Sequence, residues 1–186
     1  REENPKEVYE ALNDAGIETF VSEVEHPGDV PEMLIQLGER LNLEAKANEL
    51  ATSIHQELKG IPQLKGPIVL PMIWHEPLMA VSPQKYSGAL LEACGFHVPD
   101  LEPNGNGYPV VSPEQIIEHN VEGLLLSSEP HEFSKQEGEA ICDAVEALGG
   151  QRPWTKCIDG EALTWFGSHT HQGLRTFIAL CKDLKT

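Results

Sequence analysis

The sequence predicts a doubly wound α/β fold, and three observations lead to this prediction. From residue 67 onward, short apolar runs alternate with helical stretches, as in parallel sheets whose strands are joined by helices. Before them, residues 43–59 carry apolar side chains at helical spacing over a length that is long for a connector. The chain of 186 residues is 40% hydrophobic and 23% charged, which is typical of a globular protein.

The first 60 residues predict mostly helices. Residues 5–16 have an apolar stripe that a glycine ends, and residues 17–24 are apolar enough for a short strand. No strand that could pair with this one precedes it. A second helical zone follows Asp29, which is placed to cap it. The next helix, residues 43–59, would be about 25 Å long at 1.5 Å per residue.

The alternating part of the chain begins with a strand over residues 67–74. Pro71 within it favours an edge strand or a bulge, because proline lacks the N–H that an inner strand needs. Residues 86–94 then predict a helix that ends at a glycine. Ser112 caps the following short helix, and Gln115 completes a capping box with it.

The remaining elements continue the same alternation. Residues 124–126 predict a buried strand, Ser134 caps the next helix, and residues 157–158 mark another short strand. Ser168 is expected to cap the terminal helix. Ligands on such sheets bind at the carboxyl ends of the strands. The candidate site therefore consists of three loops, at residues 74–83, 127–133 and 160–171.

The first loop combines Trp74, His75 and Met79. This aromatic and sulfur-bearing set suits a flat, partly apolar ligand, with His75 as a polar contact or a metal ligand. The alternative is an ordinary strand end in which Trp74 covers the core.

The second loop contains Glu129, His131 and Glu132, whose imidazole and carboxylate groups are of the kinds that bind divalent cations. No helical H-E-x-x-H pattern supports a metal here. A solvated acidic loop is the simpler interpretation.

The third loop holds Trp165 and Phe166, which must cover the core, a ligand or a partner. A helix that starts at Ser168 would direct backbone N–H groups at the cleft and favour an anionic group. His169 and His171 have a spacing that permits metal chelation, although most such pairs in loops bind no metal.

Charge and motifs exclude several classes of function. The chain has 30 acidic and 13 basic residues and a formal net charge of −17, which disfavours binding to nucleic-acid backbones and to anionic lipids. The sequence contains no G-x-S-x-G elbow and no glycine-rich phosphate loop, so nucleophilic catalysis has little support. The 4 cysteines lack C-x-x-C spacing, and their even number permits two disulfides.

Several stretches, in this order and spacing, carry a family resemblance: MIWHEPLMAV at 72–81, LLEACG at 90–95, YPVVSPE at 108–114, LLLSSEP at 124–130 and DGEALTWFGS at 159–168. Residues 61–186 resemble the helical-backbone periplasmic substrate-binding proteins of ABC importers for cobalamin, ferric siderophores and haem. The cobalamin-binding branch is the most similar.

The resemblance implies a division of the chain into three parts. Residues 1–28 would be the remnant of an N-terminal lobe, residues 29–60 the connecting and backbone helices, and residues 61–186 the C-terminal α/β lobe. The start of the chain, residues 1–5, is similar to a segment midway through the family's first lobe. We therefore expect only the tail of that lobe here, in a fragment or in a chain whose true N-terminus lies upstream.

The resemblance also implies function. The chain would be a monomeric, non-enzymatic binding component, located in the periplasm or another extracytoplasmic space, without a cofactor or a resident metal. It would hold cobalamin, a ferric siderophore or haem between two lobes and dock on an ABC permease through Glu132. Cys94 and Cys181 would form a disulfide, and His169 stands where relatives often have a basic residue. The residues expected to face the ligand are Trp74, His75, Met79, Glu129, Trp165, Phe166 and His169.

Two other functions compete with this one. A metal-dependent enzyme would use the loop histidines, namely His75, His131, His169 and His171. An acidic interaction domain would bind no small ligand. Metal analysis and mutation of His169 and His171 would separate the enzyme from the binding protein.

Overall fold

The computed structural model describes residues 5–184, and its centre is a four-stranded sheet in the order β2-β1-β3-β4. The strands β1 (Val69–Trp74), β3 (Gly123–Ser127) and β4 (Trp154–Ile158) are parallel, whereas the short β2 (Met79–Ala80) runs antiparallel to β1. The predicted α/β class with a mainly parallel sheet is confirmed.

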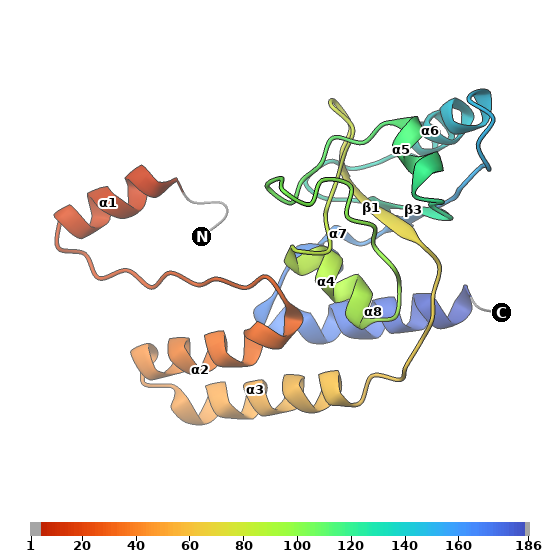
Figure 1. Cartoon of the computed structure of the whole chain (residues 1–186). Coiled ribbons are helices and arrows are strands. Elements are labelled where there is room, and N and C mark those ends of the chain that lie inside the picture. The colour runs from red at the N-terminus through yellow and green to blue at the C-terminus, as the bar shows by residue number, and fades with distance from the viewer. Residues whose placement is uncertain (1–4, 185–186) are drawn as a thin grey trace.

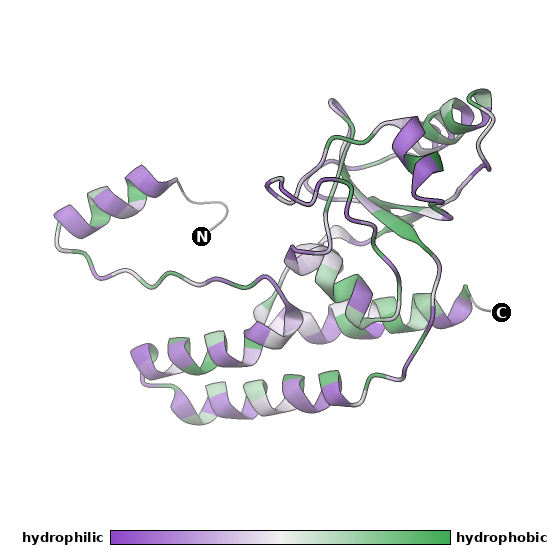
Figure 2. Cartoon of the chain, in the orientation of Figure 1, coloured by the Kyte–Doolittle hydropathy of each residue, from purple (hydrophilic) through white to green (hydrophobic). Residues whose placement is uncertain are grey.

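Helices cover both faces of the sheet (Figure 1). The helices α4 (Tyr86–Ala93), α7 (Gly160–Thr164) and α8 (Thr170–Asp183) share one apolar core with Val69 and Leu125. The helices α5 (Pro113–Glu118) and α6 (Lys135–Ala147) cover the opposite face of the sheet. They pack against strand residues that alternate in sequence with Val69 and Leu125, because successive side chains of a strand point to opposite faces. Strand β1 is mostly hydrophobic (Figure 2), and its first four residues are buried, as expected for a strand covered on both faces.

A helical hairpin of α2 (Val30–Leu41) and α3 (Glu44–Lys59) packs beside the lobe (Figure 1). Asn42 turns the chain between these helices in a left-handed conformation, with φ of 54°. Glu57 on α3 binds His171 and Arg175 on α8, and Ile54 enters the core that α8 covers. Because of these contacts, α3 is fixed to the sheet-bearing part of the chain.

The segment before the hairpin differs in part from expectation. The predicted first helix is present as α1 (Lys6–Asp14), which buries none of its residues and lies apart from the rest (Figure 1). The predicted strand at residues 17–24 is wrong: in the described structure this segment is extended but belongs to no strand. A β-strand exists only through pairing with a neighbour, and none lies beside it. The similarity noted for residues 1–5 falls largely on residues 1–4, outside the described part.

The predicted helix caps at Ser112 and Ser134 are confirmed, and the predicted cap at Asp29 is wrong. Ser112 accepts a hydrogen bond from the Gln115 amide at 3.4 Å, and Ser134 accepts one from the Glu137 amide at 3.2 Å. The Asp29 carboxylate makes no capping hydrogen bond to α2 and instead accepts one from the His26 amide, at 2.8 Å. One helix start is also corrected. The terminal helix begins at Thr170, not after Ser168, because a short 3₁₀ turn (Gly167–His169) precedes it.

The position of Pro71 corrects another expectation. Its strand is an inner one, between β2 and β3, so the edge alternative is wrong. The antiparallel register between β1 and β2 shifts between Met72 and Trp74. This shift is an irregularity of the kind expected from a β-bulge, which was the other alternative.

The predicted disulfide is also corrected. Among the described residues, no disulfide joins any two of the 4 cysteines, Cys94 and Cys181 included. Burial, and secondarily the charge of a Cys181 thiolate, raise the pKa of Cys94 to about 12, so its thiol stays protonated and unreactive. Its Sγ instead donates a weak hydrogen bond to the Leu174 carbonyl at 3.8 Å.

Within residues 5–184, no helix combines the length and the apolar character that crossing a membrane requires.

Candidate functional site

The carboxyl ends of β1, β3 and β4 meet at one edge of the sheet, which we call the carboxyl edge. Trp74 is the last residue of β1, Glu129 follows β3, and Trp165 follows the short helix after β4. The Trp165 indole N–H donates to a Glu129 carboxylate oxygen at 3.1 Å. The second and third predicted loops are therefore in direct contact through two predicted ligand-binding residues.

The loops after β3 and β4 are also in close backbone contact at Gly160. The Gly160 amide donates to the Ser128 hydroxyl at 2.9 Å, and a Cβ at position 160 would lie 2.6 Å from the Glu129 backbone nitrogen. Only glycine allows this approach of the two loops. Asp159, which precedes Gly160, caps α7 through the Glu161 amide at 3.0 Å. The close packing fixes the direction in which the Trp165 loop leaves the sheet.

Three large aromatic side chains remain exposed along this edge. Trp74 is 41% exposed, Trp165 is 47% exposed and Phe166 is 41% exposed. Phe166 packs edge-on against Tyr86 with ring centres 5.6 Å apart, so it is anchored on one side only. Exposed apolar groups gathered from separate loops mark a binding surface more often than isolated ones do.

The first and second loops meet through their histidines. The His75 and His131 rings are stacked with centres 5.6 Å apart, and Phe133 packs edge-on against both. Trp74 also packs edge-on against His131 at 6.2 Å. The predicted contact residue His75 therefore lies beside Trp74 in an aromatic cluster.

Glu137 completes this cluster, and the sequence analysis missed it. One of its carboxylate oxygens lies 2.8 Å from His131 Nε2 and 3.7 Å from His75 Nδ1. Hydrogen bonds from the Ser134 hydroxyl and amide, and then from His131, lower the pKa of Glu137 to about 2. The S-x-x-E spacing from Ser134 was the available signal, since a capping box turns Glu137 back toward the loop before the helix.

His169 packs against one of the three exposed aromatic side chains, whereas His171 does not. The His169 ring packs on Trp165 with centres 5.0 Å apart, and its Nδ1 is buried with no hydrogen-bond partner in the described structure. The His171 ring turns toward α3, where its Nδ1 pairs with Glu57. These two histidines therefore do not form the chelating pair that the metal-enzyme alternative needs.

Within the described part of the chain, neither Glu132 nor Met79 makes a ring contact of the kind described above. Glu132 is exposed in the loop after β3, between His131 and Phe133. Met79 pairs with Trp74 across the β1–β2 register, but it lines a different groove, of about 600 Å³, together with Tyr108 and Val110.

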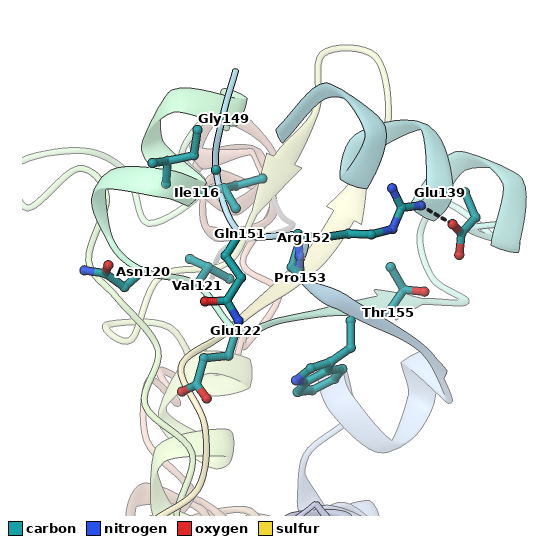
Figure 3. A pocket seen from close by; sticks show the side chains of 13 residues that line it. Ile116, Asn120, Val121, Glu122, Glu139, Gly149, Gln151, Arg152, Pro153 and Thr155 are labelled. Atoms are coloured by element: carbon teal, nitrogen blue, oxygen red, sulfur yellow. Dashed lines mark hydrogen bonds and ion pairs between the residues drawn. The ribbon is translucent and has the colours of Figure 1, made fainter. Parts of the chain in front are cut away.

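A further pocket, of about 570 Å³, lies at the opposite edge of the sheet, among α5, α6 and the start of β4 (Figure 3). Arg152 extends along it and pairs with Glu139, Asp143 and Glu146 of α6. Hydrogen bonds to Asp143, Glu146 and Glu139 raise the pKa of Arg152 above its ordinary value. The pocket contains none of the predicted site residues.

No known sequence family matches the chain, and no curated protein matches it. Several solved structures share its fold. The periplasmic vitamin B12 binding protein of Vibrio cholerae superimposes with a TM-score of 0.73 at 14% identity, over 98% of this chain and 72% of that one. The periplasmic haem-binding protein of Vibrio cholerae gives 0.71 at 22% identity, over 95% and 72%. A periplasmic haem-binding protein from Pseudomonas aeruginosa gives 0.75 at 16% identity, over 96% and 68%.

The chain therefore has the fold of periplasmic binding proteins for vitamin B12 and haem. The similar TM-scores do not single out the vitamin B12 protein, so the fold gives no preference for the cobalamin branch.

Proposed function

We propose that this chain is a non-enzymatic substrate-binding component of an ABC importer, and that it binds a flat metal chelate such as cobalamin, haem or a ferric siderophore. The observation that carries this proposal is the gathering of Trp74, Trp165 and Phe166 at the carboxyl edge, all exposed and from two loops. Proteins of the same fold are named for binding vitamin B12 and haem.

The carboxyl edge suits such a ligand in shape and in chemistry. Aromatic faces contact a planar macrocycle at little entropic cost, because each ring has only two rotatable side-chain bonds. The hydrogen bond from Trp165 to Glu129 holds one of these faces in position before the ligand arrives. The partly exposed His75 supplies a polar contact, and His169, whose ring packs on Trp165, supplies a second one.

The arrangement of the chain supports the same function. We propose that residues 61–186 are one lobe of the binding protein, that residues 29–60 are its connecting and backbone helices, and that residues 1–28 belong to the tail of a second lobe. Helix α3, of 16 residues and about 24 Å, is held to α8 by Glu57 and acts as the stiff element between lobes. The ligand would then bind between the carboxyl edge and the other lobe.

The proposed partner is a permease with a basic face, in a periplasmic or other extracytoplasmic setting. The net charge of −17 favours association with such a face through electrostatic steering. Glu132 is exposed in the loop after β3, on the ligand-facing side of the lobe, and is the proposed docking residue.

Titration with cyanocobalamin, haemin and a ferric siderophore, followed by calorimetry, tests the proposal. One of the three is expected to bind, and Trp165→Ala should weaken it at least about 5-fold, because an aromatic contact contributes about 1 kcal/mol. Leu148→Ala is the control, since Leu148 is a similarly exposed apolar residue, 53%, at the end of α6 and outside the two loops that carry the exposed aromatic residues. Equal loss in both variants, or no binding of any of the three compounds, would contradict the proposal.

A further inference from the structure

The cluster of His75, His131 and Glu137 has the composition of a metal site. It is the one group of three or more histidine, cysteine or acidic residues, within the described chain, whose candidate ligand atoms all lie within 4.8 Å of one another. The side chains come from separate loops and a helix, after β1, after β3 and in the first turn of α6. The fold, not local sequence, therefore brings them together.

We propose that His75, His131 and Glu137 bind a free divalent transition-metal ion of the zinc class. This inference does not rest on the proposed importer function, because it requires only these three side chains. It also differs from the metal sites considered on sequence, since it includes Glu137 and excludes His169 and His171.

The distances suit a tetrahedral ion after small side-chain movements. Two ligands at about 2.0–2.1 Å from zinc, separated by a tetrahedral angle, lie about 3.3 Å from each other. The Glu137 oxygen is 2.8 Å from His131 Nε2 and 3.7 Å from His75 Nδ1, one distance on each side of that value. Both imidazoles are partly exposed, at 30% and 34%, so the rings have room to rotate by the few tenths of an ångström required.

Neighbouring residues orient the three proposed ligand side chains, as residues around the ligands of a metal site do. The second carboxylate oxygen of Glu137 accepts hydrogen bonds from the Ser134 amide and hydroxyl, both at 2.6 Å, which leaves the first oxygen free to face the imidazoles. Phe133 supports both rings edge-on, and the His131 amide donates to the Ile73 carbonyl at 3.3 Å. Carboxylate and imidazoles are thus oriented before an ion binds.

The donor set selects the class of ion. Two imidazoles and one carboxylate suit zinc and neighbouring ions such as cobalt, nickel and copper. Calcium and magnesium prefer six or more oxygen ligands, which this group does not offer. Three protein ligands leave a fourth position open, as in zinc sites that bind water or an exchangeable donor. That position lies on the carboxyl edge beside Trp74, whose ring packs against His131.

Zinc titration of the EDTA-treated full chain, in competition with a chromophoric chelator, tests the site. The wild-type chain is expected to bind one zinc ion, and His75→Ala, His131→Ala and Glu137→Gln should each lower the affinity at least about 10-fold. Glutamine also serves at this position of a capping box, so Glu137→Gln removes the anionic ligand while it keeps α6 capped. Cobalt absorption provides a second readout, because a tetrahedral cobalt spectrum should be lost in the same three variants.

His97→Ala is the matched control, because His97 is an exposed histidine that also faces a glutamate, Glu92 at 3.6 Å, but without a third ligand. It should leave zinc affinity unchanged. Should His131→Ala unfold, which circular dichroism would reveal, His131→Asn replaces it and should show the same loss of affinity. No zinc uptake by the wild type, equal loss in His97→Ala, or unchanged affinity in Glu137→Gln would each overturn the three-ligand site. Haemin and cobalamin binding, measured separately with zinc absent, reports on the importer proposal alone.

Discussion

Gly160→Ala tests whether the loops after β3 and β4 are packed as closely as the structure shows. A methyl group at this position would meet the Glu129 backbone nitrogen at 2.6 Å and the Ser127 hydroxyl at 2.8 Å. The Glu129 backbone can relieve this contact only if its whole loop moves. Overpacking of this kind costs roughly 1–3 kcal/mol of the free energy of unfolding. The same displacement would separate Trp165 from Glu129, which now share a hydrogen bond of 3.1 Å.

Urea unfolding followed by circular dichroism measures this cost, with Gly60→Ala as the control. A methyl group at Gly60 would meet its nearest atoms at 3.4 and 3.5 Å, which is ordinary contact, and φ of −84° suits alanine. Gly60→Ala should therefore be neutral or stabilising by about 0.4–1 kcal/mol. The reasoning fails if Gly160→Ala unfolds within about 0.5 kcal/mol of the wild type, since surface changes away from special features stay within that range.

Two further predictions concern stability. The folded pKa of Glu137, about 2, lies below its ordinary value of 4.5, so its contribution to stability is complete above pH 4.5 and is lost as the pH falls toward 2. The free energy of unfolding in urea should therefore change less between pH 7 and pH 3 in Glu137→Gln than in the wild type. An equal change in the two proteins would refute this pKa. Phe177→Ala should lower the free energy of unfolding by about 3–5 kcal/mol, because Phe177 is fully buried between α8 and the sheet; a loss below about 1 kcal/mol in the same assay would show that this core is not packed as described.

Elements whose signals are local were predictable from the sequence. The capping box of Ser112 with Gln115 and the helix cap at Ser134 involve residues three apart, and both form as expected. The apolar run at residues 124–126 lies in a strand buried on both faces, where hydrophobicity alone is sufficient. Elements that depend on a distant partner were not predictable in this way. Strand β2 has two residues and exists through its register with β1, while residues 17–24 have strand-like composition but pair with no strand of the described structure.

The candidate site shows the same limit. Sequence placed Trp74 and Trp165 in loops at the carboxyl ends of strands, and in the structure Trp74 ends β1 and Trp165 follows the short helix after β4. It did not reveal that Glu137 joins His75 and His131, because that contact depends on how the first turn of α6 lies against the loop after β1. The family resemblance also implied a bond between Cys94 and Cys181, which both lie in the core but form no disulfide in the described structure.

The most direct test of ligand binding at the carboxyl edge uses the indole N–H signals of the 3 tryptophans in an NMR titration. Trp74 and Trp165 lie at this edge, whereas Trp154 lines the pocket at the opposite edge and serves as an internal reference. Cyanocobalamin and a diamagnetic gallium analogue of haem are suitable ligands, and tryptophan-to-phenylalanine variants assign the signals. Binding as proposed predicts that the Trp74 and Trp165 signals shift while the Trp154 signal stays. A shift of Trp154 alone, or no shift with either compound, would contradict it.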